Sequence, residues 1–117
     1  MYTHPWTGTG IGVAILDTGL YPHIDFGERI LGFQDFLGHH PYPYDDSGHG
    51  THVAGILAGN GKSGRGLYSG MAPEAQIFAV KVLNQRGGGK IRDVINGIRY
   101  VLLKQKEMQI RIVNISI

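Results

Sequence analysis

The sequence predicts an α/β fold in which helices cover both faces of a parallel sheet, giving three layers. The run Ile11–Leu16 is nearly continuously apolar, as is typical of a strand buried on both faces. Further along the chain, strand-like segments alternate with helix-like ones, which favours β-α-β units with right-handed crossovers. A length of 117 residues with 42% apolar and 17% charged residues fits one globular domain.

The next two elements are a weaker strand and a helix of small residues. Ile30–Phe36 favours the strand, and turn-forming residues fill the loop His39–Ser47 that follows it. Residues 45–47 are acceptable N-terminal caps for a helix that continues to Ala58. Because glycines and alanines interleave with apolar residues and leave almost no polar face, we expect this helix to be central and tightly packed.

The second half of the chain repeats the alternation. A glycine-rich loop, Gly59–Gly70, leads to a third strand at Gln76–Leu83. After the flexible link Gly87–Gly89, an apolar stripe predicts a helix from Ile91 to about Met108, and Ile110–Ser116 predicts a fourth strand. Ligands of such sheets bind outside the carboxyl ends of the strands, so the segments that follow these strands should converge on one edge.

The composition argues against several classes of function. The net charge of +2 comes from 11 Lys and Arg residues spread along the chain, so no basic stripe is present for nucleic acid or anionic lipid. The absence of cysteine excludes disulfides and thiol chemistry. No apolar run reaches membrane-spanning length and no signal peptide is recognisable, so we expect no membrane partner and leave the compartment, secreted or cytoplasmic, open.

Asp17 and His49 have the residue types of a catalytic pair. Asp17 ends the first predicted strand, and His49 lies in the first turn of the first helix. A buried carboxylate that holds one imidazole nitrogen stabilises the imidazolium that forms when the other nitrogen deprotonates a hydroxyl. No serine with suitable surroundings follows in these 117 residues. We expect His52, one turn deeper, to be a packed, hydrogen-bonded core residue.

Five segments together carry a family resemblance: Val13–Gly19, His49–Gly55, Gly70–Pro73, Ala79–Leu83 and Asn114–Ile117. At these segments the chain strongly resembles the subtilisin-like serine peptidases, or subtilases. The motifs follow the family's order and approximate spacing, and the resemblance extends over almost the whole chain. An Asp-Thr-Gly sequence alone would be weak evidence, whereas the set of motifs is specific.

The resemblance implies a serine endopeptidase that hydrolyses peptide bonds through an Asp-His-Ser triad. Asp17 would orient His49, and His49 would activate a serine supplied later in the sequence. Residues 1–117 would then be the amino-terminal part of a subtilase catalytic domain, with the fold truncated to its first β-α-β units. Because loss of the serine costs subtilisin on the order of a millionfold in turnover, we expect no meaningful peptidase activity from this chain alone.

The resemblance also implies that polypeptide substrates bind as an extended strand. Glycine suits positions where another backbone must approach closely, although a flexible loop explains the glycines as well. Ile91 would line a pocket for a substrate side chain. The residues that would flank the substrate are Gly87, Gly88, Gly89, Ser116 and Ile117.

Calcium is common in the subtilases, but the triad chemistry requires no cofactor. Asp25 occupies the position of a family calcium ligand, and the loop around Asn60 would supply further ligands. This loop, Gly59–Ser69, contains Lys62 and Arg65 but no carboxylate. Such a composition disfavours a cation that needs six or more oxygen ligands.

Other interpretations of the same residues remain open. Ile15–Gly19 also resembles the active-site segment of aspartic peptidases, whose short members dimerise to pair two aspartates. The predicted helices and the His49 segment have no place in that fold. A zinc site at His49 and His52 lacks the glutamate and the histidine spacing of helical zinc peptidases. A non-catalytic binding module on the same scaffold is a further alternative.

The last predicted strand suggests a partner of a different kind. Its apolar residues lie in the segment Ile110–Ile117, at what would be an open edge of the sheet. An exposed apolar edge strand is a template for pairing with another chain. We therefore expect this chain to self-associate through that segment.

Overall fold

The computed structural model describes residues 6–65 and 69–116. Its centre is a four-stranded, fully parallel sheet with the order β2-β3-β1-β4. The predicted parallel α/β architecture is therefore confirmed. The strands are β1 (Gly12–Asp17), β2 (Ile30–Asp35), β3 (Gln76–Lys81) and β4 (Ile110–Ile115). The helices are α1 (His49–Ala58) and α2 (Ile91–Lys104), with the short 3-10 turns η1 (Ile24–Phe26) and η2 (Lys62–Gly64).

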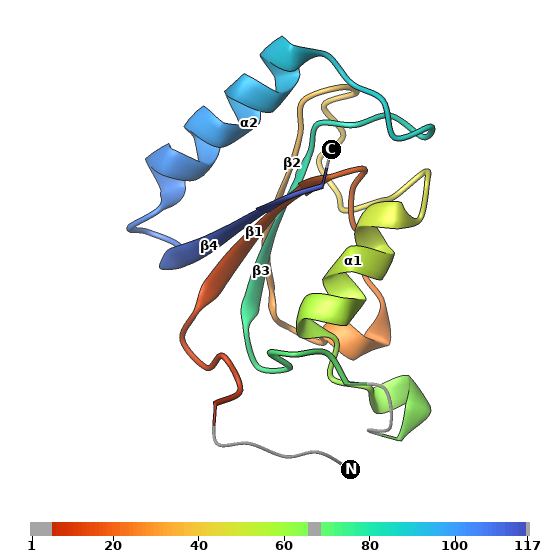
Figure 1. The fold of residues 1–117 in the computed structure, drawn as a ribbon, viewed down its shortest axis with the longest axis vertical. Coiled ribbons are helices and arrows are strands. Elements are labelled where there is room, and N and C mark those ends of the chain that lie inside the picture. Colours follow the sequence, from red (N-terminus) through yellow and green to blue (C-terminus); the bar gives the residue numbers. More distant parts are fainter. Residues whose placement is uncertain (1–5, 66–68, 117) are drawn as a thin grey trace.

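The two helices cover opposite faces of the sheet (Figure 1). Successive residues of a strand point to opposite faces, and β1 is buried along its whole length. Val13 and Ile15 accordingly belong to the apolar cluster that contains Ala54 of α1. Leu16 belongs to the second cluster, with Val101 of α2. The apolar run of β1 thus reflects burial on both faces.

The strand bounds agree with the prediction to within one residue, except that the third strand and the second helix end earlier than predicted. The third strand ends at Lys81 because the N–H groups of Val82 and Leu83 both turn to the carbonyl oxygen of Asp17. Helix α2 ends at Lys104, because the residues that follow form a turn that closes on β4. Gln109 in this turn has a φ of 50°, which is incompatible with a continued right-handed helix.

The expectation of a central, tightly packed first helix holds for one face only. Gly50, Ala54 and Ala58 pack against the rest of the molecule, but Ile56 is 58% exposed. His52 is also exposed, so it is not the packed core residue that we expected. The small residues allow one face of α1 to lie close to the sheet, and no described segment covers the other face.

In the described ranges, 6–65 and 69–116, no helix is long and apolar enough to cross a membrane.

The sheet register brings three buried charged residues to one edge. Asp17 at the end of β1 is paired in register with Lys81 of β3, which in turn is paired with Asp35 of β2. All three side chains are at most 1% exposed. Since charged groups are rarely buried without partners, we expect specific polar contacts to be concentrated at this edge of the sheet.

Candidate active site

Asp17 and His49 form a hydrogen-bonded pair at the carboxyl end of β1. The Nδ1 atom of His49 lies 2.9 Å from Oδ1 of Asp17. The side chain of Asp17 is fully buried, whereas that of His49 is 55% exposed. The hydrogen bond to Asp17 and the negative charge of that carboxylate raise the pKa of His49 above its ordinary value of 6.5. Such an imidazole can accept a proton from a hydroxyl that approaches its other nitrogen.

The carboxylate of Asp17 has few other partners. Its Oδ1 also accepts a hydrogen bond from the backbone N–H of Thr18 at 2.7 Å. Its Oδ2 is buried and has no hydrogen-bond partner among the residues that the structure describes. Leaving a buried acceptor unpaired costs free energy of folding. The hydrogen bonds from His49 and Thr18 to Oδ1 must therefore offset the burial of the whole carboxylate.

Two glycines allow α1 to approach the turn that follows β1. A Cβ atom on Gly50 would lie 2.3 Å from the carbonyl oxygen of Gly19. One on Gly19 would lie 2.2 Å from the carbonyl oxygen of Tyr44, and the φ of Gly19 is 131°. Residues with side chains rarely adopt that conformation. The close contact that brings His49 to Asp17 therefore requires glycine at both positions.

The first turn of α1 is capped by side chains that precede the helix in sequence. The N-cap residue itself, Gly48, has no side chain to contribute. Three of the free N–H groups of the turn are satisfied from outside the helix, which explains why it begins at His49. The pairs are Gly50 N with Thr18 Oγ1 (2.8 Å), Thr51 N with Asp45 Oδ2 (2.9 Å) and His49 N with Ser47 Oγ (3.4 Å).

Lys81 is a buried cation next to this pair. Its Nζ atom donates to the carbonyl oxygens of Thr18 at 2.6 Å and Leu83 at 2.7 Å. It also lies 2.8 Å from Oδ1 of Asp46. Asp46, which the sequence suggested as a helix cap, thus binds Lys81 instead. A single ammonium group joins the turn after β1, the segment after β3 and the loop before α1.

Asp35 forms a second Asp-His pair, at the end of β2. Its Oδ2 lies 3.1 Å from Nδ1 of His40 and accepts a hydrogen bond from the hydroxyl of Tyr44 at 2.7 Å. Burial opposes ionisation of Asp35, but the hydrogen bonds from Tyr44 and from the backbone N–H groups of Leu37 and Gly38 hold its pKa well below the usual range. Burial and the hydrogen bond to Asp35 raise the pKa of Tyr44. These contacts organise the loop between β2 and α1.

The proposed substrate-binding residues lie on both sides of β1. The segment Gly87–Gly89 is an exposed loop after β3, and Ile91 at the start of α2 is 79% exposed. Oδ1 of Asn84 accepts a hydrogen bond from the N–H of Gly88 at 3.1 Å and helps to shape this loop. Ser116 follows β4, the strand on the other side of β1. Ile117 lies outside the described residues.

The side chains suggested for calcium, those of Asp25 and Asn60, already accept hydrogen bonds from residues of η2. Asp25 accepts hydrogen bonds from the backbone N–H of Ser63 at 2.8 Å and from its hydroxyl at 3.1 Å. Oδ1 of Asn60 accepts one from the N–H of Lys62 at 2.8 Å. Within residues 6–65 and 69–116, no group of three or more His, Cys, Asp or Glu side chains is placed to hold a metal ion. This donor set fits calcium poorly.

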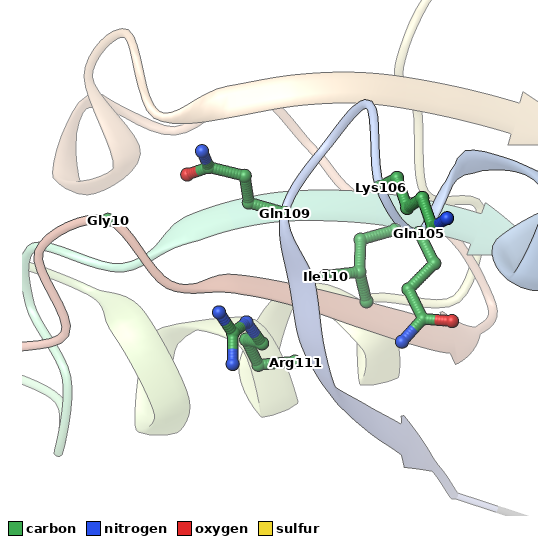
Figure 2. Close-up of a pocket in the computed structure, with 6 residues that line it drawn as sticks. All are labelled: Gly10, Gln105, Lys106, Gln109, Ile110 and Arg111. Carbon is green, nitrogen blue, oxygen red and sulfur yellow. The ribbon is translucent and has the colours of Figure 1, made fainter.

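A separate polar pocket lies at the opposite end of β1. Figure 2 shows that it is formed by the turn between α2 and β4 and by Gly10, which precedes β1. Because Asp17 ends β1 and the pocket borders its start, the pocket is separate from the Asp17–His49 pair. Its lining residues are Gly10, Gln105, Lys106, Gln109, Ile110 and Arg111.

Comparison with known proteins identifies the family. Residues 8–117 match the sequence model of the subtilase family of peptidases. The chain belongs to this family. Serine protease AprX of Bacillus subtilis is 50% identical over 96 residues, which cover 82% of this chain and 22% of that protein. Thermitase of Thermoactinomyces vulgaris is 42% identical over 94 residues, which cover 80% of this chain and 33% of that protein.

The fold agrees with a solved subtilase structure. A cold-adapted subtilisin-like serine proteinase superposes with a TM-score of 0.77 and 33% sequence identity, covering 88% of this chain and 36% of that one. This subtilase chain thus spans about a fifth to a third of the length of the curated relatives described above. The aspartic-peptidase alternative is not favoured, because the fold is a parallel α/β sheet and the Asp17 carboxylate binds a histidine.

The sequence predicted the Asp17–His49 pair but not all of the groups that hold it in place. Asp45 was expected only as a helix cap, and Lys81 only as part of a strand. A lysine inside the apolar run Ala79–Leu83 was a usable signal, since a buried cation needs oxygen partners. The role of Asn84 had no comparable signal, because asparagine is common in turns.

Proposed function

We propose that this chain supplies the aspartate and histidine of an Asp-His-Ser triad in a serine endopeptidase. The observation that carries the proposal is the hydrogen bond between buried Asp17 and exposed His49 at the carboxyl end of a parallel strand. Relatives that are named as serine proteases support it. The serine would come from polypeptide that is not among these 117 residues.

The geometry assigns a role to each nitrogen of His49. Nδ1 donates to Asp17, so Nε2 is the acceptor that takes the proton from the serine hydroxyl as its oxygen attacks the peptide carbonyl. The carboxylate of Asp17 stabilises the imidazolium that results. The imidazolium then returns the proton to the leaving amine, and a water molecule repeats the sequence to release the acyl group.

The chain alone is proposed to be inactive as a peptidase. Its described serines make no hydrogen bond to the imidazole of His49, and the one described residue that the imidazole bonds to is Asp17. Without a nucleophile the pair has no hydroxyl to activate, and the remaining rate would be that of water attack. Purified chain should therefore show no cleavage that a serine-directed inhibitor abolishes.

The substrate would be a polypeptide bound in extended form. The exposed loop Gly87–Gly89 and the segment at Ser116 lie on opposite sides of the end of β1. A peptide between them would bind through its backbone, as a strand added to existing segments. Ile91, exposed beside the loop, would contact a substrate side chain. We further propose that the hydrogen bonds between Asp25 and Ser63 hold the segment Asn60–Arg65 in place without a bound cation.

Self-association of this chain is proposed to occur through β4. This strand pairs with β1 on one side, and no described strand pairs with its other side. Ile112, Val113 and Ile115 are 52%, 45% and 40% exposed, so apolar residues are uncovered on both faces of the strand. Unpaired backbone groups beside exposed apolar side chains favour addition of a second strand.

The function is tested by restoring a serine-bearing segment. Residues 1–116 are joined to the part of AprX that follows its matched region, and hydrolysis of a fluorogenic peptide is measured. The proposal predicts activity that a serine-directed inhibitor removes. Replacing His49 with alanine should lower kcat by about 10⁶-fold, the loss found for subtilisin. A chimera that is equally active with and without His49 would overturn the proposal.

A further inference from the structure

The carboxylate of Asp45 connects the neighbours of both catalytic residues. Its Oδ1 accepts a hydrogen bond from the hydroxyl of Thr18 at 2.8 Å, and Thr18 directly follows Asp17. The same hydroxyl accepts a hydrogen bond from the N–H of Gly50 at 2.8 Å, and Gly50 directly follows His49. We propose that Asp45 is a positioning residue that fixes the Asp17–His49 contact through the hydroxyl of Thr18.

The second oxygen of Asp45 makes a parallel connection. Oδ2 lies 2.9 Å from the N–H and 2.6 Å from the hydroxyl of Thr51, in the first turn of α1. The hydroxyl of Thr51 in turn accepts a hydrogen bond from the N–H of Tyr21 at 2.9 Å. Asp45 therefore fastens the start of α1 to the segment after β1 at two points, one through Thr18 and one through Thr51.

The ionised state of Asp45 sets the direction of these hydrogen bonds. Burial opposes ionisation, but hydrogen bonds from the side chain of Thr51 and from the backbone N–H of Gly48 outweigh it and lower the pKa of Asp45 to about 2. At neutral pH Asp45 is thus an acceptor only. The single hydroxyl proton of Thr18 is committed to Asp45, which leaves the Thr18 oxygen free to accept from Gly50.

Asp45 controls where the first turn of α1 lies relative to the segment after β1. Gly50 already lies against Gly19, so a small shift of the helix start changes the distance between His49 and Asp17. Asp45 makes no hydrogen bond to the side chain of Asp17 or of His49, and it acts on their positions through the hydroxyl of Thr18 and the backbone of α1. Its negative charge also helps to raise the pKa of His49, so the Thr18 variant is the cleaner test of positioning. A misplacement of about 1 Å in a catalytic group can cost on the order of a hundredfold in rate.

Replacing Thr18 by valine tests positioning without changing any charge. In NMR titrations of this chain, we expect Thr18→Val to move the pKa of His49 back toward 6.5 and to weaken the downfield Nδ1–H signal. Thr18→Ser, which keeps the hydroxyl, should restore both. Asp45→Asn should also reduce both, and Glu107→Gln, which removes a charge from an exposed residue, should leave them unchanged.

The possible results distinguish the positioning role of Asp45 from the proposed function. The effect of Asp45 on catalysis rests on the proposed function, whereas its effect on the His49 signals does not. Unchanged His49 signals in folded Thr18→Val, or in Asp45→Asn where the valine variant fails to fold, would overturn the positioning role whatever the peptidase assay shows. In the AprX chimera, Thr18→Val should lower kcat about 10- to 100-fold with little change in KM. Altered His49 signals in a chimera without activity would leave the positioning role standing and refute the function.

Discussion

At the residue scale, the Asp17–His49 pair depends on one buried carboxylate. The imidazole of His49 donates a hydrogen bond to Oδ1 of Asp17, while Oδ2 has no donor among the described residues. The residue types and their places, after a strand and at a helix start, were sufficient to predict this pair. What the sequence could not show is the contact of Gly50 with Gly19, because those residues are far apart in the chain and meet only in the fold.

The charge of Asp17 should be visible in the titration of His49. Asp17→Asn is expected to return the pKa of His49 toward 6.5, because the neutral amide no longer favours the imidazolium. A raised folded-state pKa stabilises the fold below pH 6.5, and this stabilisation is lost as pH rises through the folded-state value. The stability difference between wild type and variant should therefore shrink above pH 6.5. NMR of the His49 ring and denaturation at several pH values measure both effects, and an unchanged pKa in the variant would refute the pairing.

Gly50 offers a steric test with an internal control. A methyl group there would lie 2.3 Å from the carbonyl oxygen of Gly19, so Gly50→Ala should cost about 1–3 kcal/mol in urea denaturation. Gly55, in the same helix, has nothing within 4 Å of its added Cβ. Gly55→Ala should stabilise the chain by up to about 1 kcal/mol, since alanine favours a helix over glycine. Equal effects of the two substitutions would contradict the close approach of α1.

At the element scale, the carboxyl edge of the sheet is held by charged side chains from three strands. Lys81 lies between Asp17 and Asp35 in register and donates to oxygens from three segments. Strand alternation predicted the sheet, but the burial of α1 was mispredicted. Small residues show that a helix can pack closely, whereas the number of faces actually covered depends on the other segments present. His52 and Ile56 are exposed for this reason.

Lys81 should contribute strongly to the stability of this edge. Lys81→Met removes donors from two buried carbonyl oxygens and from Asp46, and should lower the free energy of unfolding by about 2–4 kcal/mol. Lys104 on α2 is the matched control, since it pairs with exposed Glu107 at 3.4 Å. Lys104→Met should cost about 0.5 kcal/mol or less. Similar losses in denaturant titrations of the two variants would argue against a structural role for Lys81.

At the scale of the whole molecule, this chain is a short parallel sheet with one uncovered edge. Helices lie on both faces (Figure 1), yet β4 remains exposed where β2, at the other edge, is half-buried. The subtilase relatives are three to five times longer than the matched region. The order of strands was not predicted, because it depends on long-range pairing that local sequence patterns do not specify.

The exposed strand should govern the oligomeric state of the chain. Val113→Lys places a charge on β4 and should shift the chain toward monomer in sedimentation velocity, because an edge charge opposes strand addition. Leu103→Lys adds the same charge at an 81% exposed position on α2 and should not. Wild-type chain that sediments as a monomer at high concentration would contradict self-association through β4.

The most direct test of the central claim is the reactivity of a serine placed opposite His49. In the AprX chimera, the rate at which a fluorophosphonate labels the serine reports how strongly the imidazole activates it. If Asp17 and His49 act as the first two members of a triad, His49→Ala should reduce this rate by at least about a thousandfold. A labelling rate that does not change when His49 is replaced would contradict the account.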